Sequence, residues 1–171
     1  MAKPTPLKDA LKALEAKEEM PKEEMENVKL YGFMPPISKL DASLSTLKKC
    51  KKLSLSTNTI DKITSVSGMD SLEILSLGRN NIKKIEGLDG VADTLKELWI
   101  SYNNIEKLAG VEKLKALEVL FMCVPTAATP ATPRMHARMA PVARATWRPR
   151  KADHVRRREP WLAEIGGGAG G

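Results

Sequence analysis

Histidine and cysteine are scarce in this chain of 171 residues, and their positions exclude several classes of protein. The two histidines, His136 and His154, both lie near the C-terminus, so the rest of the chain cannot form a Ser-His-Asp or Cys-His arrangement. Cys50 and Cys123 show neither CxxC spacing nor a nearby histidine, which argues against a metal site, a redox motif and a disulfide scaffold. We therefore predict a non-catalytic protein with no metal, no cofactor and no small-molecule substrate.

Long apolar runs are also missing. The first twenty residues lack the apolar core of a signal peptide, and no stretch approaches the roughly 18 apolar residues that a membrane helix needs. The acidic run at 15–26 reads as a solvated surface rather than a metal site. These features predict a soluble intracellular protein of a reducing compartment, without a membrane partner.

The net charge of +7 is unevenly distributed. Residues 1–122 hold 19 Lys and Arg against 18 Asp and Glu, whereas residues 123–171 hold nine against three. The later segment is also rich in alanine and proline and ends in GGGAGG. Either it arises from an unspliced intron, a shifted reading frame or an alternative exon, or it is a basic disordered tail. In both cases we expect no packed fold in residues 123–171, and the nearly neutral remainder predicts no nucleic-acid partner.

A repeat of 22 to 23 residues organises the preceding part of the chain. Three copies align on an asparagine: CKKLSLSTNTI at 50–60, LEILSLGRNNI at 72–82 and LKELWISYNNI at 95–105. A fourth begins at LEVLFM, 117–122. The asparagines are Asn58, Asn80 and Asn103, and further apolar residues follow each one at spacings of about three.

The template LxxLxLxxNxI indicates an α/β leucine-rich-repeat solenoid. Its LxL leucines point into the core from one face of a short strand, since side chains alternate along a strand. The asparagine amide can bond the backbone of the following turn, and the later apolar residues suit a helical or 3₁₀ return segment. We predict parallel strands near 53–55, 75–77, 98–100 and 120–122, on the concave side of repeats that span residues 50–122.

Residues 1–49 are predicted to cap the array. Thr5 followed by Pro6 at the first helical position begins a helix whose apolar face is Leu7, Leu11 and Leu14, and Pro21 ends it. A degenerate repeat follows, with apolar residues at Leu30, Ile37, Leu40, Leu44 and Leu47 and with Pro35-Pro36 in place of the regular turn. Such a unit shields the first strand from pairing with other chains.

The outward-facing strand residues are the candidate site. The first repeat fills these positions with Lys52, Ser54, Ser56 and Thr57, whereas later repeats carry larger apolar and aromatic groups. The residues predicted to bind a partner are Ile74, Arg79, Trp99, Tyr102, Val119 and Phe121. Aromatic residues and arginine are frequent hot spots of protein interfaces. The alternative is that these side chains cover a neighbouring segment, derived from the tail or from a missing repeat.

The segments DASLSTLKKCKKLSLSTN, ILSLGRNNIKKIEGL and DTLKELWISYNNIEKL resemble the axonemal outer-arm dynein light chain 1 family. The resemblance covers roughly residues 1–122. It implies a light chain that binds the motor region of a dynein heavy chain, contacts microtubules (tubulin) and regulates ciliary or flagellar motility. It also implies a location in the cytoplasm and cytoskeleton, at the axoneme of a cilium or flagellum.

The chain departs from that family at Cys123. Family members continue through further repeats to a helical cap, so Leu114, Leu117, Leu120 and Met122 are expected to lack a stacking neighbour here. Two other classes stay open. An intracellular repeat scaffold or regulatory subunit of the phosphatase or splicing type would share the consensus but not the segment from Trp99 to Tyr102. A nucleic-acid-binding protein would depend on the arginine-rich tail alone.

Overall fold

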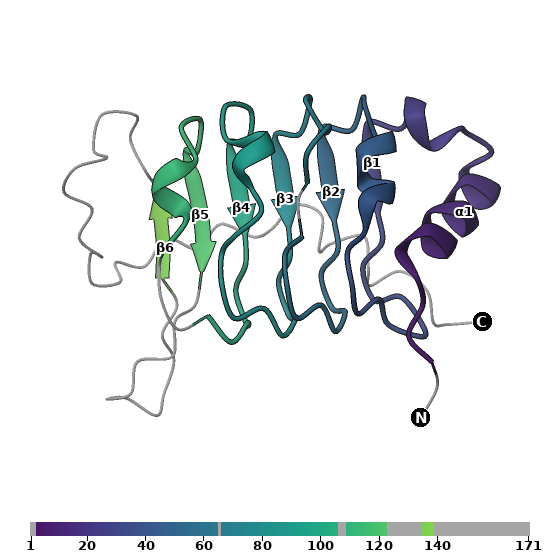
Figure 1. The fold of residues 1–171 in the computed structure, drawn as a ribbon, viewed down its shortest axis with the longest axis horizontal. Helices are drawn as coiled ribbons and strands as arrows, with labels where there is room; N and C mark the ends of the chain where they lie inside the picture. Colours follow the sequence, from purple (N-terminus) through teal and green to yellow (C-terminus); the bar gives the residue numbers. More distant parts are fainter. Residues whose placement is uncertain (1–2, 65, 106–108, 123–134, 139–171) are drawn as a thin grey trace, which may run out of the picture.

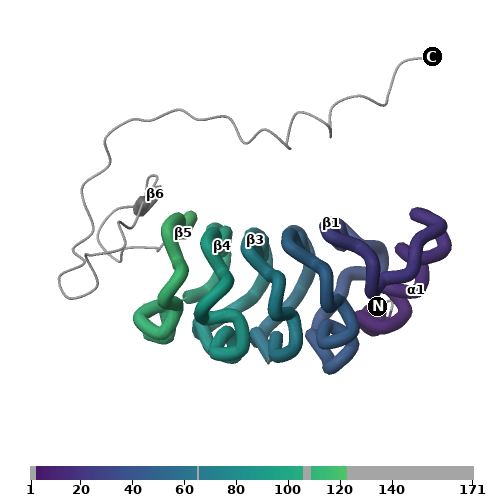
Figure 2. Tube along the Cα trace, turned by 90° about the horizontal axis from the view of Figure 1, so that it is seen from above, coloured from purple at the N-terminus to yellow at the C-terminus, as the bar shows by residue number. Residues whose placement is uncertain are grey.

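The computed structural model of the chain describes residues 3–64, 66–105 and 109–122, and the backbone of 135–138. Its strands form one six-stranded sheet in sequence order, β1-β2-β3-β4-β5-β6 (Figure 1). Seen from above, the strands line one side of a row of stacked coils and the return segments line the other (Figure 2). This is the predicted repeat solenoid.

The parallel strands begin and end within one residue of their predicted positions. They are β2 (Lys52–Ser54), β3 (Ile74–Ser76), β4 (Glu97–Trp99) and β5 (Val119–Met122), each parallel to its predecessor. Equivalent leucines are paired across the sheet and buried: Leu53, Leu75, Leu98 and Leu120. One unit thus completes the core of the next, as repeat architectures require.

Short 3₁₀ helices carry the chain back between strands. They are η2 (Ala42–Thr46), η3 (Asp89–Val91) and η4 (Val111–Lys113), and a further one, η1 (Lys22–Glu24), lies in the cap. The helices η2, η3 and η4 each bury one apolar side chain, which is Leu44, Val91 and Val111 in turn. The predicted 3₁₀ return segments are confirmed.

The repeat asparagines bond backward, to the preceding unit. Asn80 Oδ1 accepts a hydrogen bond from the Ile60 N–H at 3.0 Å, and its Nδ2 donates to the carbonyls of Leu55 and Leu77, both at 3.0 Å. Asn58 and Asn103 repeat this pattern one unit earlier and one unit later. All three side chains are buried, so each satisfies backbone groups that water cannot reach.

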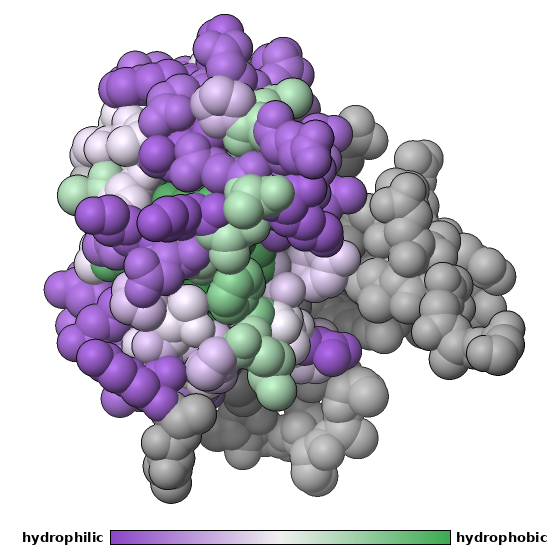
Figure 3. Space-filling model, turned by 90° about the vertical axis from the view of Figure 1, so that its right-hand side faces the viewer, coloured by the Kyte–Doolittle hydropathy of each residue, from purple (hydrophilic) through white to green (hydrophobic). Residues whose placement is uncertain are grey.

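The N-terminal cap differs from the prediction at both ends of its helix, α1 (Leu7–Glu18). Pro6 is the N-cap residue, because Thr5 is extended and its hydroxyl donates to the Pro35 carbonyl at 2.7 Å. The helix stops at Glu18, since Glu19 adopts a left-handed conformation (φ 51°), before Pro21 is reached. Its predicted apolar face is buried together with Ala10. The view onto this end of the molecule shows a mainly hydrophilic surface with a narrow apolar strip (Figure 3).

A strand that the repeat template does not mark precedes the first full repeat. Asn27–Lys29 forms β1, parallel to β2, with Val28 opposite Leu53. Phe33 follows where later units place asparagine, so the template fails at this turn. The Ile37 N–H nevertheless donates to Asn58 Oδ1 at 3.0 Å, which makes 27–40 a true first unit.

After residue 122 the structure describes one further element, a single strand and not a packed unit. Met135–Arg138 forms β6, which pairs antiparallel with β5. An edge strand offers unpaired N–H and C=O groups that any extended segment can satisfy, and composition does not reveal such pairing. The remaining tail residues and Cys123 lie outside the described residues.

Cys50 is the buried thiol that the repeat position predicts. Its Sγ donates to the Lys52 carbonyl at 3.3 Å, and burial raises the pKa of the thiol to about 11. The thiol is therefore neutral in the folded protein and serves as a small apolar side chain.

Candidate partner-binding surface

The residues of β2 to β5 on the face opposite the core leucines lie in two rows across the strands, which we call the strand face. One row contains Lys52, Ile74, Glu97 and Val119, and the other contains Ser54, Ser76, Trp99 and Phe121. Both rows change from polar residues at β2 to apolar and aromatic residues at β5. The strand face is therefore chemically asymmetric along the array.

Trp99 and Phe121 form its aromatic end. Their rings stack with centroids 3.8 Å apart and planes inclined by 26°. The Trp99 indole N–H donates to a Glu97 carboxylate oxygen at 3.1 Å, which fixes the ring on the sheet. Both side chains are partly exposed, and Val119 lies two residues from Phe121 on the same face. The result is a rigid apolar platform with one polar group at its margin.

Ile74 is separated from this platform. It is paired with Glu97, which in turn is paired with Val119, so a carboxylate interrupts the row. Trp99 is paired with Ser76, which is buried and hydrogen-bonded to the Ser56 hydroxyl at 2.7 Å. The predicted residues therefore do not form one continuous stripe.

Arg79 and Tyr102 form a second pair, at the turn that follows the strands. The Arg79 guanidinium carbon lies 5.5 Å from the centroid of the Tyr102 ring, within the range of a cation–π interaction. Both residues have left-handed backbones, with φ of 55° and 58°, and Thr57 occupies the same place in the first repeat. Tyr102 is 58% exposed. This conformation costs free energy in residues other than glycine, so the turn geometry of the repeat imposes it.

The polar end offers little apolar contact. Lys52 is exposed, and Ser54 is partly exposed although its hydroxyl oxygen is buried without a hydrogen-bond partner. Ser54 thus provides a small polar position on the same face as Trp99, two strands away. It is a suitable reference point for mutations of the aromatic end.

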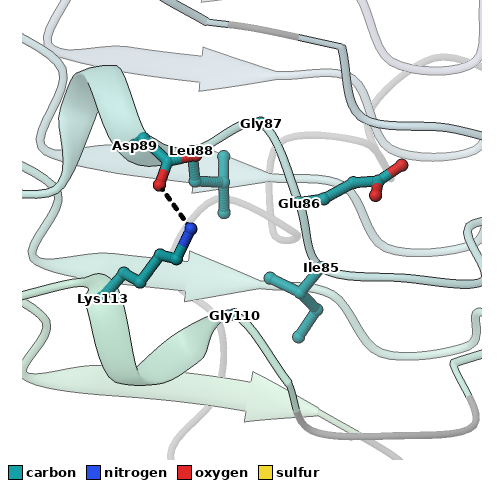
Figure 4. Close-up of a pocket in the computed structure, with 7 residues that line it drawn as sticks. All are labelled: Ile85, Glu86, Gly87, Leu88, Asp89, Gly110 and Lys113. Atoms are coloured by element: carbon teal, nitrogen blue, oxygen red, sulfur yellow. Dashed lines mark hydrogen bonds and ion pairs between the residues drawn. The ribbon is translucent and has the colours of Figure 1, made fainter.

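On the opposite side of the array, a hollow of about 80 Å³ lies between two return segments (Figure 4). It is lined by Ile85, Glu86, Gly87, Leu88, Asp89, Gly110 and Lys113. Lys113 donates to Asp89 at 2.9 Å and holds the pKa of that carboxyl below its usual value. Pockets for drug-sized ligands are several times larger, at roughly 300 to 1,000 Å³.

Within 3–64, 66–105 and 109–122, no three His, Cys, Asp or Glu side chains come close enough to hold a metal ion. No helix in the described part of the chain is long and apolar enough to cross a membrane. The strand face, with its stacked aromatic rings, is therefore the candidate binding surface in this part of the molecule.

Comparison with known proteins relates the chain to one group. It is 62% identical over 101 residues to dynein axonemal light chain 1 of Chlamydomonas reinhardtii, a match that covers 59% of this chain and 51% of the relative. The proteins of the same name from Danio rerio and Homo sapiens are 57% and 56% identical, over 58% and 57% of this chain and 52% and 51% of theirs. The matched region is homologous to dynein axonemal light chain 1.

This chain spans about half the length of the dynein light chain 1 relatives that it matches. No protein-family model matches it. Two solved structures from Listeria monocytogenes are similar in part. An internalin is 27% identical and matches 50% of this chain and 28% of its own, with a TM-score of 0.43. An internalin C2 is 23% identical and matches 55% of this chain and 40% of its own, with a TM-score of 0.46.

Proposed function

We propose that this chain is a non-catalytic light chain of outer-arm axonemal dynein, whose strand face binds the motor region of a heavy chain and which contacts microtubules. The observation that carries the proposal is the identity of 55% to 62% with proteins named dynein axonemal light chain 1. That name places these relatives in the axoneme, the cytoskeletal core of a cilium or flagellum. Regulation of ciliary or flagellar motility is the role that such an attachment suggests.

The strand face supplies the chemistry for a protein partner. The stacked rings of Trp99 and Phe121 offer apolar area that loses little conformational freedom on binding, because each ring is already held in place. Arg79 and Tyr102 add a planar donor and an exposed ring at the turn. Partly buried aromatic residues and arginine are the usual anchors of protein interfaces. We therefore place the heavy-chain contact over β4 and β5.

A binding titration tests the proposal directly. Purified full-length chain is titrated against a recombinant outer-arm heavy-chain motor fragment, and microtubule co-sedimentation is measured with and without that fragment. Saturable binding to the fragment is expected. Absence of binding, together with capture of a phosphatase catalytic subunit or a splicing factor by the same preparation, would identify the chain as a general repeat scaffold instead.

A further inference from the structure

The two edges of the repeat sheet differ in how they are protected. At the N-terminal edge, β1 exposes Asn27 and Lys29, and polar or charged residues at an edge discourage pairing with other chains. At the other end, β5 reads Val-Leu-Phe-Met and contains no charged residue. A short apolar strand of this kind is prone to pair with strands of other molecules when its edge is open.

The backbone of β5 has groups available for such pairing. The Phe121 carbonyl accepts a hydrogen bond from the Ile100 N–H at 2.8 Å, so Phe121 directs its backbone groups toward β4. Backbone groups alternate along a strand, and Leu120 and Met122 therefore direct theirs toward the opposite side. On that side lies β6, with Ala137 paired to Leu120 and Met135 paired to Met122.

The last unit is also well covered. Leu114, Leu117, Leu120 and Met122 were expected to lack a neighbour, yet their exposures are only 4%, 6%, 3% and 4%. The array thus ends with its terminal apolar side chains shielded. The chain achieves this without a further repeat of regular sequence, since Pro125 stands where the next asparagine would fall.

We infer that Met135–Arg138 is an edge-closing strand, which keeps this chain from associating with a second copy through β5. A second copy is the matching occupant for two reasons. First, β6 shows that this edge accepts an antiparallel partner, and two identical strands related by a twofold axis are antiparallel. Second, β5 is apolar on both faces, so two copies meet without like charges opposite each other.

Two proline variants of the full-length chain separate this role from general damage to the segment. Ala137→Pro removes an N–H that the register directs toward β5, whereas His136→Pro removes one that points away. Mass is measured by light scattering over a dilution series, with circular dichroism as the control for folding. We expect wild type and His136→Pro to be monomers, and Ala137→Pro to approach twice the monomer mass as its concentration rises.

A double variant identifies the surface through which Ala137→Pro associates. Adding Val119→Lys places a charge on β5 and should restore the monomer mass, because a lysine on an open edge strand discourages pairing with another chain. A concentration-independent monomer for folded Ala137→Pro would overturn the inference, as would equal association of both proline variants.

Hydrogen exchange of the wild type provides a measurement that needs no variant. If β6 closes the edge, the amides of Leu120 and Met122 exchange slowly in the monomer, at rates near that of Leu98 in the middle of the sheet. Exchange at the rate of open amides would overturn the inference even if Ala137→Pro failed to fold.

Discussion

Replacing Trp99 by alanine is the sharpest test of the strand face. The substitution removes the ring that stacks on Phe121 at 3.8 Å and the N–H that donates to Glu97. If the heavy-chain contact lies over β4 and β5, the change deletes a preorganised aromatic anchor at its centre. We expect affinity for the motor fragment to fall by about 2 kcal/mol or more, which is roughly 30-fold in the dissociation constant.

The fold should survive this change. Trp99 points away from the core between two buried neighbours, Leu98 and Ile100, so its removal opens no cavity inside the array. The stability lost should be about 1 to 2 kcal/mol, from the aromatic pair and the partial burial of the indole. Thermal unfolding followed by circular dichroism measures this loss separately from the binding titration.

Two further variants make the result specific. Ser54→Ala lies on the same face, at the polar end, and should change affinity by less than about 0.5 kcal/mol. Arg79→Lys keeps the charge near Tyr102 but removes the planar guanidinium, so it tests whether a bidentate donor is required. Wild-type affinity for Trp99→Ala would refute the proposed contact. Trp99 would then be explained as cover for a neighbouring segment.

Three predictions concern the repeat itself and are checked by chemical denaturation. Asn80→Ala leaves the buried Ile60 N–H without its acceptor and removes one of the two amide donors to each of the Leu55 and Leu77 carbonyls, so it should lower the free energy of unfolding by about 3 kcal/mol. Asn81→Ala, on the exposed side of the same turn, should lower it by less than about 0.5 kcal/mol. Gly110→Ala should lower the free energy of unfolding by at least about 3 kcal/mol, because φ is +98° and a Cβ would lie 2.0 Å from the Ile85 carbonyl oxygen. Gly32→Ala is also at positive φ but has open space around it, so it should lower the free energy of unfolding by only about 1 kcal/mol. The Cys50 thiol loses its proton near pH 9 when unfolded and near 11 when folded, so the unfolded state binds fewer protons in this window and stability should fall by about 2 to 3 kcal/mol as pH rises through it. Cys50→Ala should lack that part of the alkaline loss, and an identical pH profile for the two proteins would contradict the assignment.

The periodic part of the sequence predicts the fold well because one rule acts at every unit. Leu53, Leu75 and Leu98 recur with the asparagines, and only a stacked parallel sheet buries them all. The sequence does not show which unit the asparagine side chains bond to, since each amide could equally form hydrogen bonds with the backbone of its own turn. The Ile60 N–H lies 20 residues before the Asn80 that accepts from it, and the two groups meet only because neighbouring units stack in the folded protein.

Irregular positions explain what sequence reasoning missed. Phe33 replaces the asparagine of the first unit, so β1 carries no recognisable template. Thr5 bonds to Pro35 rather than capping α1, because the loop at 31–36 lies beside the helix start. On the strand face, the row from Ile74 to Val119 is broken by Glu97, which requires knowledge of the pairing register. The residue types of each strand, considered one strand at a time, do not show that Glu97 stands between Ile74 and Val119.

The hydrogen bonds of the asparagines to the preceding unit set an order in which the turns of the array can be completed. Because Asn58 satisfies the Ile37 N–H and Asn80 satisfies the Ile60 N–H, a turn is finished only after the following unit has been made. A ribosome produces the chain in this same order, so each emerging unit completes the one already folded. The turn at Asn103 differs from the earlier ones, because no asparagine stands at position 125 to accept from it. We therefore expect the turns to be completed in order from the capped end, and the turn at Asn103 to open before the strands beside it.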